Sequence, residues 1–209
     1  MLVPVTCRTI LYRTFLLSFL ELLGVSKDVY IYFFSKVRAG QKHQDSSKMI
    51  AQEDIFGPFL ALQLLSIVVW FFMYSKRIPF IDNYIAKQKK DGVPLKSEDL
   101  GDPSSKHYLP MIAPQSVMTS SDNLRNLFEV PVMFYAMTGY LYMTRVVDET
   151  YLWTAWTFVL LRFLHSVIHC TFNAVMPRFL IYVASSMALW FMIVRATINH
   201  VLVGYPNLQ

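Results

Sequence analysis

The chain has 209 residues, of which 55% are hydrophobic and 16% are charged, whereas about 25% of the residues of an average soluble domain are charged. This composition excludes a disordered chain and argues against a soluble enzyme. The net charge of +5 is spread over segments of mixed sign, which argues against nucleic acid as a partner and favours contact with membrane lipid.

Residues 1–54 predict an N-terminal extension. Their apolar run, residues 14–20, lies between Arg13 and Glu21 and is far shorter than the ~20 residues of a crossing. We therefore expect an interfacial amphipathic helix in the headgroup layer. A signal peptide and a mitochondrial presequence are the alternatives, because Arg8 and Arg13 precede the first acidic residue.

Residues 55–75 carry no formal charge and predict the first transmembrane helix. Pro58 suits a first helical turn, and Lys76 and Arg77 mark the arrival at the headgroups, where we expect the helix to end. The segment 76–116 is rich in proline and charge, which predicts a long polar loop with one amphipathic piece near residues 81–90.

Three further crossings are predicted at about residues 120–143, 151–169 and 178–195. Together with the first crossing they make an all-α integral membrane domain of four transmembrane helices, over residues 55–209. The mitochondrial inner membrane and the endoplasmic reticulum are the two locations that we consider.

Ionisable side chains within the predicted spans are the candidate functional residues, because charge is costly inside a bilayer. On the second predicted helix Asp122, Arg125, Asn126 and Glu129 share one face. Arg125 and Glu129 also stand at the i,i+4 spacing of an ordinary helix ion pair, so a purely structural role is the simpler interpretation of these two.

The third predicted helix carries Arg162, His165 and His169 on one face, and Asn173 continues the spacing. The structural interpretation is that Arg162 pairs with Glu129 or Asp122 inside the bundle. Two histidines at i,i+4 spacing can bind a metal ion, but no neighbouring helix glutamate and no cysteine cluster supports such a site, so no metal is predicted.

Arg178 follows Pro177 at the predicted start of the fourth helix. A cation there opposes the helix dipole, so helix stability does not account for it. We expect a compensating anion, which is either a lipid phosphate or an anionic ligand or thiolate.

Two segments, residues 126–136 (NLFEVPVMFYA) and residues 162–169 (RFLHSVIH), followed by Arg178, resemble the MAPEG family of membrane-associated proteins in eicosanoid and glutathione metabolism. The likeness covers about residues 55–200 and is closest to the bacterial-type members of unassigned substrate. It implies a four-helix bundle that forms a homotrimer, with glutathione bound between adjacent subunits.

The resemblance also implies roles for single residues. Arg178 is the expected catalytic residue, because a guanidinium near the glutathione sulfur favours the nucleophilic thiolate. The glutathione-binding set that it implies is Asn126, Glu129, Arg162, His165, His169 and Arg125.

The chain departs from the family pattern at three positions. Asp122 stands where the resemblance implies an arginine for a glutathione carboxylate, His169 stands where a tyrosine is expected, and the nearby Phe172 lacks a hydroxyl. Two hypotheses follow. The first is a glutathione-dependent transferase or peroxidase acting on lipophilic electrophiles. The second is a catalytically silent structural subunit of a larger membrane assembly, such as a mitochondrial respiratory complex.

Overall fold

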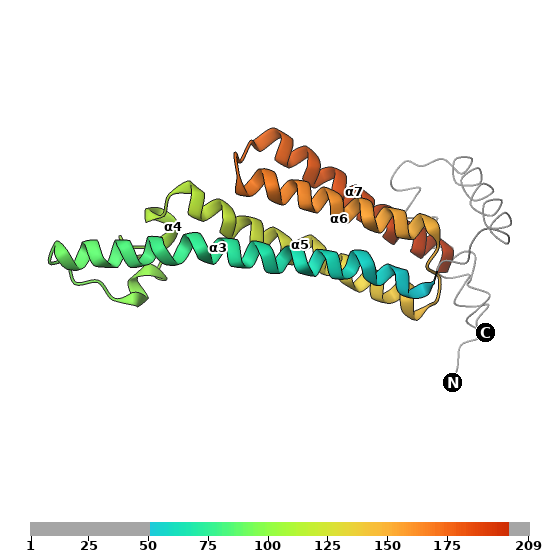
Figure 1. Cartoon of the computed structure of the whole chain (residues 1–209), viewed down its shortest axis with the longest axis horizontal. Coiled ribbons are helices and arrows are strands. Elements are labelled where there is room, and N and C mark those ends of the chain that lie inside the picture. Colours follow the sequence, from blue (N-terminus) through green and yellow to red (C-terminus); the bar gives the residue numbers. More distant parts are fainter. Residues whose placement is uncertain (1–50, 201–209) are drawn as a thin grey trace.

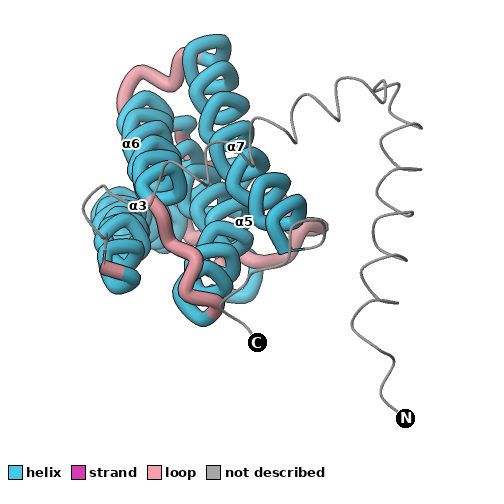
Figure 2. Tube along the Cα trace, turned by 90° about the vertical axis from the view of Figure 1, so that its right-hand side faces the viewer, coloured by secondary structure: helices cyan, strands magenta, loops and turns pink. Residues whose placement is uncertain are grey.

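The computed structural model describes residues 51–200, and within this range every regular element is a helix. The interfacial helix predicted for the N-terminal extension lies outside the described residues. Four long helices lie side by side as a bundle (Figure 1 and Figure 2). They are α3 (Phe56–Lys90), α5 (Gln115–Met143), α6 (Glu149–Cys170) and α7 (Val175–Ile198).

Three of the predicted helices are present with small shifts at their ends. α5 begins at Gln115 because Pro114, in an extended conformation, precedes its first turn. α6 begins after Asp148, whose side chain accepts a hydrogen bond from the backbone N–H of Tyr151 and so caps the helix. α7 begins at Val175, so that Arg178 lies at the end of its first turn instead of at its first residue.

The predicted end of the first helix at Lys76 is wrong. α3 continues to Lys90 and passes through Pro79 without ending. Lys and Arg mark a membrane surface without ending a helix, and the last residues of this segment, 86–90 (AKQKK), are strong helix formers. The polar connection is therefore shorter than predicted, and it contains two short elements, η3 (Ser97–Leu100) and α4 (Leu109–Ile112).

Three helical segments are long and apolar enough to cross a membrane: Gln52–Lys90, which joins the short helix η2 (Gln52–Ile55) to α3, then α6 and α7. α5 does not reach the same hydropathy, because polar side chains crowd its first half. The four-helix bundle is thus present, while the crossing by α5 stays a prediction.

Apolar side chains fill the interior and also cover much of the outer surface. Phe134 of α5 stacks on Phe158 of α6 with 4.7 Å between ring centroids, and neither ring is exposed. Large residues on the outside, such as Leu64 and Phe71 at 61% and 63% exposure, fit a lipid-facing surface.

One end of the bundle, where α5 turns into α6 and α7 ends, is held by side chains that pair with one another or with the backbone, although the buried Oδ1 of Asn199 lacks a partner among the described residues. Arg195 of α7 forms a two-pronged salt bridge with Asp148, and its guanidinium carbon lies 4.2 Å from the ring centroid of Tyr151. Gln52 makes hydrogen bonds to both the N–H and the carbonyl of Val147, at 2.9 and 3.2 Å. We call this region the paired end.

Candidate functional site

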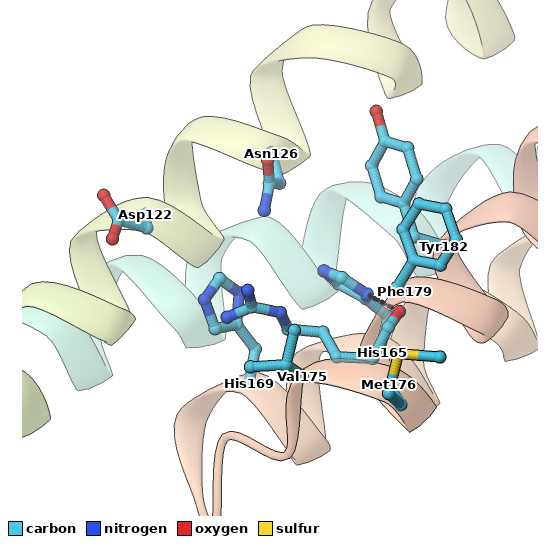
Figure 3. A pocket seen from close by; sticks show the side chains of 9 residues that line it. Asp122, Asn126, His165, His169, Val175, Met176, Phe179 and Tyr182 are labelled. Carbon is cyan, nitrogen blue, oxygen red and sulfur yellow. Dashed lines mark hydrogen bonds between the residues drawn. The ribbon is translucent and has the colours of Figure 1, made fainter.

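At the opposite end of the bundle, α5, α6 and α7 enclose an open pocket of about 350 Å³ (Figure 3). We call this region the pocket end. The pocket is lined by side chains from all three helices: Asp122, Asn126, His165, His169, Val175, Met176, Arg178, Phe179 and Tyr182.

The pocket lies near one end of the helices and not at their middle. Tyr182, its deepest residue on α7, is seven residues beyond Val175, which corresponds to about 10 Å along the axis at ~1.5 Å per residue. Its place therefore fits the zone where a membrane core meets the headgroups, a depth that both a polar and a lipophilic molecule can reach.

The α6 wall of the pocket carries His165 and His169, each only 3% exposed. Nδ1 of His165 donates to the backbone carbonyl of Arg178 at 3.1 Å. Because a carbonyl can only accept, the proton sits on Nδ1, and Nε2 of a neutral His165 is an acceptor. Within residues 51–200 neither this Nε2 nor Nδ1 of His169 has a hydrogen-bond partner.

The α7 wall carries Arg178, whose Nη1 donates to Oδ1 of Asn173. Asn173 is not part of the helical face on which the sequence placed it. α6 ends at Cys170, and Asn173 lies in the connection with a positive φ of 47°, a conformation that asparagine adopts more readily than most residues. Nε and Nη2 of Arg178 donate to no other described side chain or backbone group, so they are available to a ligand.

Arg162 lies behind the pocket and is completely buried. Its guanidinium carbon is 4.7 Å from the ring centroid of Tyr182 and 5.3 Å from that of Phe158, which gives it cation–π contacts. The predicted pairing with Glu129 or Asp122 is not formed within this protomer. In the described part of the chain all three guanidinium nitrogens lack a hydrogen-bond partner.

Two residues of the predicted binding set do not reach the pocket of their own protomer. Arg125 and Glu129 are exposed on α5 and do not line it. The structure therefore brings Asn126, His165 and His169 together with Arg178, sets Arg162 behind them, and leaves Arg125 and Glu129 on the outer surface.

Tyr182 is a pocket residue that the sequence reasoning missed. It follows Arg178 by four residues, so the two share one face of α7, and this spacing was the available signal. Its ring lies 5.6 Å from that of His165. Tyr182 brings a phenolic hydroxyl to the pocket lining, whereas Phe172 is 68% exposed and is not part of the lining.

The fold and the pocket define a class: a helical protein with spans suited to a membrane and a polar cavity built from three of its helices. A family model places the chain more narrowly. Residues 55–198 match the MAPEG family, and because this match covers more than half of the 209 residues, the chain belongs to that family. No curated protein and no solved structure matches the chain.

Proposed function

We propose that the chain binds glutathione in this pocket and uses it as a transferase or peroxidase on lipophilic electrophiles. One observation carries the proposal. Arg178, with two guanidinium nitrogens that meet no described partner, lines the same cavity as the unpartnered Nε2 of His165. Membership of a family linked to glutathione metabolism supports this thiol as the co-substrate.

The groups at the pocket suit thiol chemistry. The Arg178 guanidinium favours the thiolate over the thiol, and Nε2 of His165 is an acceptor for the thiol proton. The thiolate then attacks an electrophilic carbon, forming a C–S bond while the electron pair leaves with the displaced or adjacent atom. With a hydroperoxide, sulfur takes one oxygen and an alcohol leaves. A second thiol then gives the disulfide and water.

The apolar part of the lining suits the second substrate. Val175, Met176 and Phe179 line the pocket beside Arg178 and are themselves exposed on α7. A lipophilic electrophile dissolved in the membrane can therefore approach the thiolate along an apolar surface, which supports this class of substrate over a hydrophilic one.

The exposed charges of α5 support a homotrimer in the proposal. Arg125 and Glu129 on an otherwise apolar bundle are costly in contact with lipid. A neighbouring protomer that covers this face would remove them from lipid and would bring them toward its own pocket. Glutathione would then lie between subunits, with Glu129 completing its binding site.

Binding of glutathione to the purified, detergent-solubilised protein tests the proposal. We expect saturable binding by calorimetry and a thiolate absorbance band on adding glutathione, with Arg178→Ala removing the band. Arg77→Ala, on α3 and outside the pocket, is the matched control and should keep it. Undetectable binding at millimolar glutathione would contradict the proposal.

A second candidate is the silent subunit of a larger membrane assembly, in the mitochondrial inner membrane or the endoplasmic reticulum. It is favoured by α3, whose last turns and the loop after them provide a surface away from the pocket. This candidate predicts copurification with other proteins in fixed ratio after mild solubilisation. It fails if the protein runs as a free homotrimer.

A further inference from the structure

The pocket has opposite charges on facing helices. Asp122 lines it from α5, and Arg178 lines it from α7 (Figure 3 labels Asp122 with Asn126 on α5 and the two histidines on α6). They do not neutralise each other, because the salt bridge found among residues 51–200 is that of Arg195 with Asp148. A ligand in the pocket thus meets the exposed carboxylate of Asp122 on one side and the guanidinium of Arg178 on the other, neither of them in a salt bridge within the described residues.

This arrangement discriminates between the parts of a ligand. Opposite charges attract and like charges repel more strongly in a partly enclosed pocket than in bulk water. A ligand ammonium beside Asp122 is therefore favoured, and a ligand carboxylate at the same place is repelled. On the other side Arg178 favours an anion, which in the proposed reaction is the thiolate.

The neighbours of Asp122 in the pocket strengthen its role. Asn126 lies one helical turn further along α5 on the same face, and its amide can accept a hydrogen bond from an ammonium group. Glu129 lies outside the pocket of its own protomer. Asp122 is thus the acidic side chain that the protomer itself offers to a bound molecule.

We infer that Asp122 selects the free α-amine of the thiol co-substrate, so that the pocket takes aminothiol peptides and rejects thiols whose amine is blocked. This inference rests on the proposed function and names a recognition element within it. Because Asp122 stands opposite the thiolate-binding side, the amine and the sulfur of the ligand bridge the pocket from α5 to α7. The carboxylates of the peptide make the smaller contribution.

Three ligands separate these contributions: glutathione, N-acetylglutathione and glutathione diethyl ester. Each is titrated by calorimetry into the full-length protein in detergent. We expect N-acetylglutathione to bind at least ten-fold more weakly than glutathione, and the diethyl ester to bind within about three-fold of it. Asp122→Asn should bind glutathione and N-acetylglutathione equally, and Asp122→Glu should restore much of the preference.

Asp54→Asn is the matched control, since Asp54 is an exposed acid at the other end of the bundle. It should keep the full preference for the free amine. Equal binding of glutathione and N-acetylglutathione by the unaltered protein would overturn the inference and leave the proposed function standing. A preference that persists in Asp122→Asn would also overturn it. Absence of glutathione binding altogether would overturn both.

Discussion

The two ends of the bundle use the same kinds of side chain in opposite ways. At the paired end Arg195 has a carboxylate partner in Asp148 and an aromatic ring beneath it in Tyr151. At the pocket end Arg162 and Arg178 have no carboxylate partner among the described residues. The polar groups of the paired end hold the ends of the helices together, whereas those of the pocket end line a cavity.

The difference shows how a structural charge can be told from a candidate functional one in a helical bundle with spans suited to a membrane. Burial does not separate them, because Arg178 at the pocket end and Arg195 at the paired end are both partly buried. Pairing of the cations with carboxylates does separate them, since Arg195 has such a partner and, among the described residues, Arg162 and Arg178 have none. Unpaired buried polar groups cost stability, so a cluster of them at one cavity indicates a site that a ligand or a neighbouring subunit completes.

The largest effect is expected for Arg178→Ala, which should lower the rate of thiol conjugation or peroxide reduction by about 100- to 1,000-fold. Loss of one charge-stabilising group at a reacting centre typically costs ~3–4 kcal/mol of transition-state stabilisation. Steady-state kinetics with a lipophilic electrophile measure the rate. The unfolding midpoint should barely move, and a fully active variant would show that Arg178 does not act at the thiolate.

Arg195→Ala should do the reverse and destabilise the protein by about 2–3 kcal/mol. It leaves Asp148 partly buried without its partner, and breaking a buried pair costs ~3–5 kcal/mol, an upper limit for this partly exposed one. Thermal unfolding in detergent measures the change, while glutathione binding should stay intact. Unchanged stability would mean that the salt bridge does not hold the paired end.

Arg162→Met tests the buried guanidinium behind the pocket. Replacing an unpartnered buried cation by an apolar residue of similar length should raise the free energy of unfolding of the separated protomer by about 1–2 kcal/mol. If Glu129 of a neighbouring subunit is its partner in a trimer, the assembled protein should instead lose stability. Unfolding measured below and above the concentration of assembly distinguishes the two.

The smallest effect is expected for Gln52→Ala, at about 1 kcal/mol of destabilisation. The change removes the two hydrogen bonds to the backbone of Val147, and each such bond contributes ~0.5–1.5 kcal/mol net. Hydrogen exchange at the start of α6 should report the loosening. Exchange near His165 should not change if the two ends are independent.

Much of the architecture could be predicted from the sequence, because long apolar segments and their charged borders are properties of the chain itself. The helices around Phe134, Phe158 and Leu189 follow from this pattern. The end of α3 could not be predicted in this way. A charged residue marks the membrane surface but does not determine where hydrogen bonding along the helix stops.

The candidate site was predictable only in part. His165, Arg178 and Asn126 were found because ionisable or polar groups stand out in apolar segments. Tyr182 was missed because tyrosine is common in such segments, and Asn173 was given the wrong geometry because spacing alone does not reveal where α6 ends. Arg125 and Glu129 face outward because of how α5 is rotated about its own axis relative to the other helices. The sequence of α5 alone does not specify this rotation.

The length of α3 has a mechanical consequence. Its 35 residues extend about 52 Å at ~1.5 Å each, whereas the hydrocarbon core of a bilayer is ~30 Å thick. In an upright helix roughly 20 Å would stand clear of the lipid, with Lys87, Lys89 and Lys90 at its tip. A molecule that binds these lysines would then be held at a fixed height above the membrane. A change in the tilt of the membrane-embedded part of α3 would move that molecule sideways.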